Sequence, residues 1–247
     1  MNLKGFHHLT AVTADAPGNH KFYTDTMGLR LVKKTVNQDD TSAYHLFYAD
    51  GVGSPGTDIT FFDWPVGKER RGTHSVTRTG FRVASEESLK WWQHRLTMKG
   101  VKQEKIAEVA GRPTLAFEDF EGQRLALVAD NEGEAHAWDK SPVPPEHQIR
   151  GLGPITMSVP DLRHTDMVLT KLMNMVPTGS FAGTHVYRMG APGAVGELHV
   201  TVDPTLPPAQ QGAGAVHHVA FNIPYAEYEA WADRLRSMQV PNSGPVD

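Results

Sequence analysis

Hydrophobic and polar positions along this chain follow a repeated order of strand, helix and further strands. Residues 6–15 ("FHHLTAVTAD") have the alternation of a β-strand, and residues 16–27 form a short polar–apolar pattern typical of a helix that Gly28 ends. Three apolar runs then follow as predicted strands, at residues 29–37, 43–50 and 58–64. The pattern predicts one βαβββ unit.

The same order of elements recurs three more times. A strand precedes a helix at residues 75–100, where Ser85 is the predicted N-cap and Gly100 the helix end. The order returns at residues 153–173 and at residues 215–238. The repeat is roughly seventy residues long. We therefore predict an α+β fold of four βαβββ units, of which the fourth is truncated before its last strands. A single α+β domain with accidental similarity between its parts is the alternative.

One βαβββ unit leaves an open sheet, so two units are expected to pack side by side into a cup with the helices outside. Residues 1–130 would form one cup-shaped domain from units one and two. Residues 131–150, rich in proline and charge, would be a linker. Residues 151–247 would form the second domain from unit three and the incomplete unit four.

Composition excludes several classes of protein. The net charge of -4 and the lack of a long basic cluster argue against a nucleic-acid partner. With no cysteine, the chain can form neither a disulfide nor a zinc–thiolate site. No apolar stretch reaches the roughly 18 residues that cross a membrane, and no signal peptide is visible, so a cytoplasmic protein without a membrane partner is expected.

Two His-His pairs begin distant predicted strands, as His7-His8 and as His217-His218. Aligning the units at their strand-to-helix junctions places His8 and His218 at equivalent positions. Neighbouring residues of a strand point to opposite faces, so one ring of each pair is expected to face the cleft. We expect His8 and His218 to lie on adjacent strands of different units, with ligating nitrogens within about 3 to 3.5 Å.

At the same position unit three has Pro154 and unit two has Arg78. Two neutral imidazoles facing one cavity suit a divalent transition metal, which usually needs a carboxylate as well. The fifth residue of each visible last strand, counted from its opening glycine, is Thr60, Ala126 or Val200, and none of these binds a metal. The carboxylate is therefore expected beyond Asp247.

Glu197 and His199 could share one face of a strand in unit three. Such a pair could bind a metal. A metal site there is not favoured, because Pro154 stands where the partner histidine would be.

In order along the chain, "GFHHLT", "YHLFYADGVGSPGT", "SPVPPEHQIRG" and "VHHVAF" resemble the ring-cleaving dioxygenases of the vicinal oxygen chelate (glyoxalase/bleomycin resistance) superfamily. The similarity is greatest to those that act on hydroquinones. The resemblance implies a non-haem iron, extradiol-type dioxygenase with Fe(II), or alternatively Mn(II), bound by His8 and His218. It places His7, Thr10 and His217 near the metal as catalytic residues. The expected partners are a hydroquinone- or catechol-type aromatic substrate and dioxygen, and a homo-oligomer is left open.

The family's glutamate ligand lies in final strands that this sequence does not contain. The chain is therefore expected to be incomplete, to hold iron weakly and to be inactive as it stands. Two other functions are considered: a metal-dependent isomerase or lyase like glyoxalase I, and a non-catalytic drug-binding protein of the same fold. The isomerase would need more carboxylate ligands, and the binding protein would lack the paired histidines.

Overall fold

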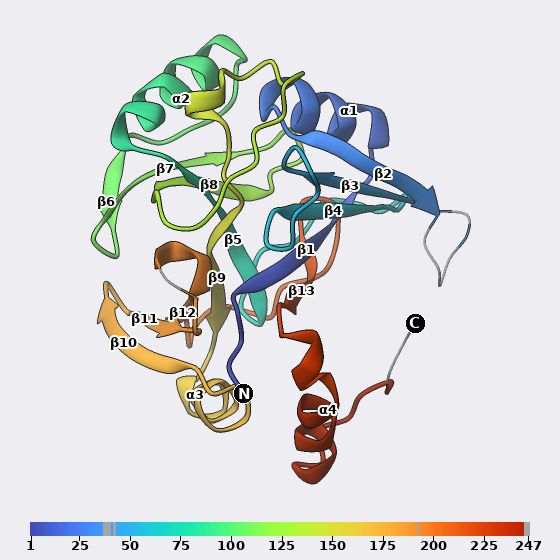
Figure 1. The fold of residues 1–247 in the computed structure, drawn as a ribbon, viewed down its shortest axis with the longest axis vertical. Helices are drawn as coiled ribbons and strands as arrows, with labels where there is room; N and C mark the ends of the chain where they lie inside the picture. The colour runs from blue at the N-terminus through green and yellow to red at the C-terminus, as the bar shows by residue number, and fades with distance from the viewer. Residues whose placement is uncertain (37–40, 42, 192, 245–247) are drawn as a thin grey trace.

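Three complete βαβββ units and the start of a fourth follow one another along the chain (Figure 1). The computed structural model describes residues 1–36, 41, 43–191 and 193–244. Unit one contains β1 (Phe6–Thr13), α1 (Ala16–Lys21) with a π-helical turn (Phe22–Thr26), β2 (Arg30–Val36), β3 (Tyr44–Ala49) and β4 (Asp58–Asp63). Unit two contains β5 (Ser75–Val83), α2 (Glu86–Met98), β6 (Ala107–Val109), β7 (Arg112–Glu118) and β8 (Arg124–Ala129).

Units three and four complete the element order. Unit three contains β9 (Leu152–Val159), α3 (Leu162–Met167) with a π-helical turn (Val168–Leu172), β10 (Val176–Phe181), β11 (Thr184–Arg188) and β12 (Glu197–Val202). Unit four contributes β13 (Val216–Phe221) and α4 (Tyr228–Ser237) to the described part of the chain. Short 3-10 turns lie at Pro145–His147, Gly193–Gly196 and Tyr225–Glu227. The predicted repeat of strand, helix and further strands is confirmed.

Local sequence explains where the helices begin and end. The carboxylate of Asp15 accepts a hydrogen bond from the backbone N–H of Gly18, and the predicted cap Ser85 accepts one from Ser88. Gly28 and Gly100 adopt φ of 71° and 70°, the left-handed conformation that ends a helix at low cost. None of the helices among the described residues is long and apolar enough to cross a membrane.

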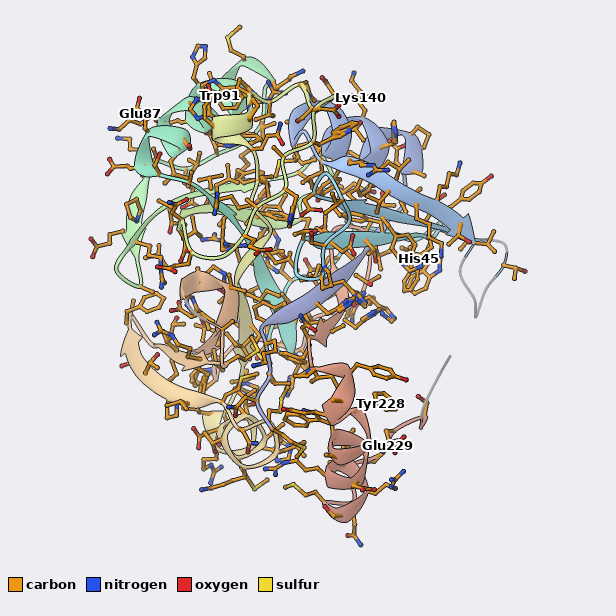
Figure 2. All side chains as sticks on the ribbon, in the orientation of Figure 1. His45, Glu87, Trp91, Lys140, Tyr228 and Glu229 are labelled. Carbon is orange, nitrogen blue, oxygen red and sulfur yellow. The ribbon has the colours of Figure 1, made fainter. Side chains whose placement is uncertain are left out.

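The strands form two curled sheets, one on each side of the molecule. In the five-stranded sheet the order is β13-β1-β4-β3-β2, and in the eight-stranded sheet it is β10-β11-β12-β9-β5-β8-β7-β6. Figure 1 shows α1 and α2 above these sheets and α3 and α4 below them. Figure 2 shows the same arrangement. Glu87 and Trp91 of α2 lie at the top of the view, and Tyr228 and Glu229 of α4 lie at the bottom.

The pairing of the units departs from the expected grouping of unit one with unit two and of unit three with unit four, and it agrees with the expected adjacency of the His8 and His218 strands. Unit one pairs with unit four through β1 and β13, and unit two pairs with unit three through β5 and β9. Periodicity along the chain defines the units, but it carries no information on which first strands meet. The sheets therefore do not follow the expected division into residues 1–130 and 151–247.

Residues 131–150, expected to be a linker, are packed against the rest of the protein. The guanidinium of Arg82 donates to the backbone oxygens of Glu132, Arg150 and Leu152. The Ser141 hydroxyl donates to the backbone oxygen of Gly28 in unit one. The segment thus connects unit two to unit one through these hydrogen bonds.

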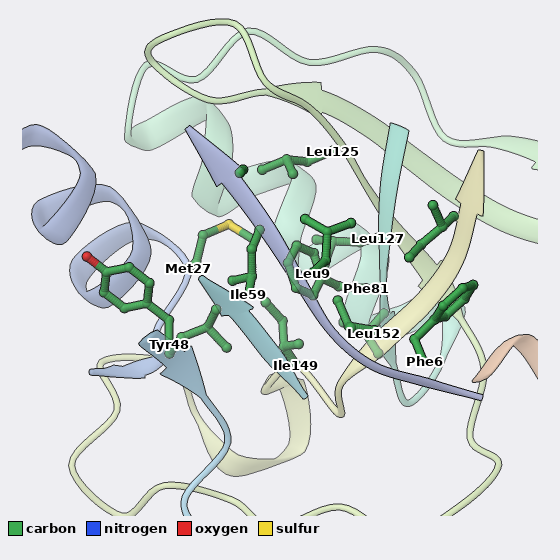
Figure 3. Close-up of a cluster of buried hydrophobic side chains, with 14 of the residues drawn as sticks. Phe6, Leu9, Met27, Tyr48, Ile59, Phe81, Leu125, Leu127, Ile149 and Leu152 are labelled. Atoms are coloured by element: carbon green, nitrogen blue, oxygen red, sulfur yellow. The ribbon is translucent and has the colours of Figure 1, made fainter. Parts of the chain in front are cut away.

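One contiguous hydrophobic cluster lies beneath both sheets (Figure 3). Leu9 from β1 and Phe81 from β5 are both fully buried in it. In Figure 3 these two side chains lie together, between Ile59 of β4 and Leu127 of β8. Each of the two curled sheets is called a cup from here on. The five-stranded sheet is the first cup, the eight-stranded sheet is the second, and the two cups share one core.

Replacing Leu9 by alanine should remove about 2 to 5 kcal/mol from the free energy of unfolding, because it leaves a cavity in the shared core. Urea unfolding followed by fluorescence and by circular dichroism measures the loss. Leu206→Ala is the matched control, since Leu206 is 47% exposed, and it should cost at most about 0.5 kcal/mol. Equal losses in the two variants would contradict the proposed packing.

Candidate metal centre

The two His-His pairs lie at matching irregularities of the antiparallel β1–β13 pair. His8 is opposite Ala220 and Thr10 is opposite His218, while the register skips His7 and His217. An extra residue of this kind is a β-bulge, which turns a side chain away from its regular direction. The Nδ1 atoms of His7 and His8 are 3.0 Å apart, and those of His217 and His218 are 2.8 Å apart. The expectation that one ring of each pair faces the cleft is wrong, because the bulges bring both rings together.

His8 and His218 meet across the strand pair, as expected. Their Nε2 atoms are 3.4 Å apart. Two nitrogens bound at about 2.1 Å to a tetrahedral ion would be separated by about 3.4 Å. The two imidazoles therefore have the spacing of two ligands of a single divalent ion. Their role as ligands stays a prediction.

Within the described residues, no group of three His, Asp or Glu side chains could hold a metal ion. The donor set observed there is two imidazole nitrogens. A third ligand of carboxylate type stays a prediction.

A chain of polar side chains extends from the two histidines to β3. The Thr10 hydroxyl lies 3.1 Å from Nε2 of His218 and 2.8 Å from the Thr60 hydroxyl. The Thr60 hydroxyl in turn lies 2.9 Å from Nε2 of His45. His45, which Figure 2 labels on β3, is thus connected to His218 through two hydroxyls.

His45 was not among the residues predicted from the sequence, because its strand alternates without showing which face is buried. The structure shows that Leu46 and Tyr48 face the core, so His45 faces the cup. The sequence carries no signal for this direction, because the register that places His45 opposite Phe62 is seen only in the structure.

Aromatic rings form a wall of this cup. Phe62 and Trp64 are stacked with ring centroids 5.0 Å apart, and the His217 ring meets both of them edge-on at 5.3 and 5.5 Å. The His45 ring lies 4.0 Å from Phe47 and 4.5 Å from Phe62. A hollow of about 260 Å³ adjoins His217 and His218, and neither Phe62 nor Trp64 lines it. Such a wall suits a flat aromatic ligand.

The environment keeps these imidazoles neutral. Burial and the neighbouring His218, His7 and His45 lower the pKa of His8 from 6.5 to about 4. Burial, His218 and Lys33 lower the pKa of His45 to about 4. Burial and His217 also lower the pKa of His218. At neutral pH the nitrogens therefore have their lone pairs available to a metal.

The structure thus brings all five predicted residues to one place. Thr10 is fully buried between His218 and Thr60, and His7 is half-buried beside His8. His217 is exposed against the aromatic wall. These positions agree with residues that orient ligands or contact substrate, but catalytic roles for His7, Thr10 and His217 stay predictions.

Comparison with known proteins places the chain in a family. Residues 5–127 match the model of the Glyoxalase/Bleomycin resistance protein/Dioxygenase superfamily. MhqA of Bacillus subtilis, provisionally named a ring-cleaving dioxygenase, is 41% identical over 100% of this chain and 81% of its own length. The chain belongs to the glyoxalase/bleomycin resistance/dioxygenase superfamily.

Other members of this superfamily agree in sequence and in fold. A chlorohydroquinone/hydroquinone 1,2-dioxygenase of Sphingobium indicum is 30% identical, covering 92% of this chain and 73% of its own. A crystal structure from Bacillus subtilis, provisionally titled a dioxygenase, superposes with a TM-score of 0.88 at 31% identity. It covers 96% of this chain and 76% of its own. The resemblance stated from the sequence is confirmed at the level of the superfamily.

The lowered histidine pKa values predict how stability depends on pH. With folded pKa values of about 4 for His8 and His45, the unfolded state binds more protons between about pH 6.5 and pH 4. Stability of the metal-free protein should therefore be full above about pH 6.5 and fall as the pH is lowered towards 4. Urea unfolding at several pH values, with a chelator present, measures this loss. His8→Asn should lose less stability over the same range, and an equal loss would contradict the assignment.

Proposed function

We propose that this chain is a ring-cleaving dioxygenase, an oxidoreductase that acts on a dihydroxylated aromatic substrate of the hydroquinone or catechol type. The observation that carries the proposal is the 3.4 Å separation of the His8 and His218 Nε2 atoms inside an aromatic-walled cup. The names of the relatives support the reaction class.

His8 and His218 would hold the metal, with Fe(II) as the proposed ion and Mn(II) as the alternative. The ion would supply Lewis-acid activation of a phenolic oxygen and redox chemistry with dioxygen. A third ligand of carboxylate type is part of the proposal, because two neutral imidazoles provide no charge to balance a divalent cation.

The aromatic wall would orient the substrate ring. Phe62 and Trp64 form a stacked pair beside His217, so a substrate ring can pack on them while a hydroxyl group points to His8 and His218. Packing of this kind also excludes water from the reacting face. His7 and His217, each within 3.0 Å of its neighbour's Nδ1, would fix the orientation of the two proposed ligands.

A proton must leave the substrate hydroxyl before the ring can be oxidised. Thr10 and Thr60 provide two hydroxyls that can each accept and donate, and the lowered pKa of His45 keeps its imidazole neutral as an acceptor. We assign Thr10, Thr60 and His45 the role of passing this proton on towards solvent, because a pKa of about 4 lets His45 accept the proton only transiently.

In a protein that also provides the proposed carboxylate ligand, replacing His8 or His218 by alanine should abolish both metal binding and oxygen uptake with hydroquinone or catechol. Loss of a direct ligand should weaken binding by more than the roughly 10- to 100-fold typical of outer partners. Anaerobic titration with Fe(II), and with Mn(II) in parallel, measures binding, and an oxygen electrode measures turnover. His94→Ala is the matched control, because His94 is exposed on α2.

Formate added to the same assays tests the proposed third ligand. If the chain lacks a carboxylate ligand, formate should tighten metal binding and raise the rate of oxygen uptake. Full oxygen uptake by both alanine variants would remove His8 and His218 from the reaction, whereas no oxygen uptake by the unmodified protein, even with formate, would favour a binding protein of the same fold. Failure of the unmodified protein to bind either ion, even with formate, would overturn the metal proposal.

Thr60→Val should interrupt the polar chain between His45 and Thr10 while keeping the shape of the side chain. We expect kcat to fall about 100-fold or more, the contribution typical of a positioned acid–base group, with little change in KM or metal affinity. Steady-state oxygen uptake as a function of pH measures the effect. Thr205→Val, at an exposed site, is the control, and unchanged kcat in Thr60→Val would remove His45 from the mechanism.

A further inference from the structure

The eight-stranded sheet contains a second cup built on the same strand geometry as the first. The β5–β9 register skips Thr77 and has one additional residue on β9 next to Pro154, which matches the two bulges of the β1–β13 pair. Arg78 therefore occupies the position of His8, and Pro154 occupies that of His218. Figure 1 shows β5 and β9 in the middle of this sheet, with β6–β8 on one side and β10–β12 on the other.

The last strands complete the comparison. Thr10 is opposite Thr60 in unit one, and Gly80 is opposite Ala126 in unit two. In unit three, Thr156 is opposite His199. Counting five residues from the opening glycine gives Val200 as the residue equivalent to Thr60. This count is one residue too long in unit three, because β12 begins one residue after Gly196, whereas β4 begins two residues after Gly56. The second cup thus has arginine and histidine at positions equivalent to His8 and Thr60.

A cavity of about 270 Å³ lies in this second cup. Val109, Val128 and Phe181 give it apolar walls, while Arg78, Thr156 and His199 give it polar groups. Pockets for drug-sized ligands begin at about 300 Å³, so this cavity suits a smaller molecule with a single ring. None of its lining residues belongs to the metal centre.

Arg78 is the cation of the cavity that is available to a ligand. Its nearest carboxylate, on Glu104, is 3.7 Å away, and the two side chains are 35% and 70% exposed. An ion pair with this separation and exposure contributes little stabilisation, so Glu104 holds the Arg78 guanidinium only weakly. Arg112, which also lines the cavity, is instead bonded to the buried Glu197 at 2.8 and 3.1 Å.

His199 lines the cavity, and its Nε2 lies beside Glu197. Burial alone would raise the pKa of Glu197, but hydrogen bonds from His199, Arg112 and Arg188 lower it to about 2. An ionised carboxylate can only accept, so Nε2 of His199, 3.3 Å away, carries a proton. The described residues provide no hydrogen-bond partner for Nδ1, which leaves it for a polar group of the ligand.

We propose that the second cup binds a small aromatic carboxylate. The ring would lie between Val109, Val128 and Phe181, and the carboxylate would pair with the guanidinium of Arg78, which matches it in a two-point geometry. This site is separate from the metal centre, and the proposal does not rest on the proposed function.

Benzoate is the probe, measured by isothermal titration calorimetry and by proton NMR line broadening. Arg78→Gln should weaken benzoate binding about 10- to 100-fold, because it removes a charge-assisted hydrogen-bond pair. Ala126→Leu should abolish benzoate binding, because the larger side chain fills the cavity that Ala126 lines. Glu104→Gln should tighten binding a few-fold, since it frees Arg78 from its weak partner. Benzyl alcohol, of similar shape but uncharged, should bind at least about 10-fold more weakly than benzoate.

Two controls locate the site. Arg71→Gln removes an arginine outside the cavity that pairs with Glu118 at 3.2 Å, and it should leave benzoate affinity unchanged. His218→Ala should also bind benzoate normally, whereas loss of binding there would place the ligand at the metal centre and overturn the proposal. Equal affinity in Arg78→Gln and the unmodified protein, or no binding at millimolar benzoate, would overturn it as well.

Discussion

The candidate metal centre depends on the antiparallel pairing of β1 with β13. This pairing joins two strands that are some two hundred residues apart, and a bulge in each strand turns a His-His pair towards the other. Without the bulges, the alternation of a regular strand would send His7 and His8 to opposite faces. The backbone irregularity therefore creates the cluster of four rings.

The same pairing sets the charge state of the cluster. Rings that are partly buried and close to one another resist protonation, because each positive charge would be poorly solvated and would repel the next. The result is a group of neutral nitrogen donors beside an aromatic wall. A cation can satisfy these donors at little cost, since no protons need to be displaced from them at neutral pH.

The two cups show how one backbone supports different chemistry. Both first-strand pairs have the same bulges, yet His8 and His218 of the first cup are replaced by Arg78 and Pro154 in the second. An arginine cannot serve as a metal ligand under ordinary conditions, but it can hold an anion. The fold thus supplies positions around a cavity, and the side chains at these positions determine what the cavity binds.

The sequence alone determined the units, the helix caps and the residues at the centre, because these depend on local periodicity and on chemistry that a single side chain carries. Ser85 caps its helix wherever the units pack, and His8 and His218 stand out by their equivalent places in the repeat. The His-His pairs indicated that the first strands of units one and four are adjacent, but only the tertiary structure decided that units two and three pair with each other and not with units one and four, since any first strand offers the same hydrogen-bonding edge. It also decided the direction of His45, because strand alternation defines two faces without saying which of them the core will cover.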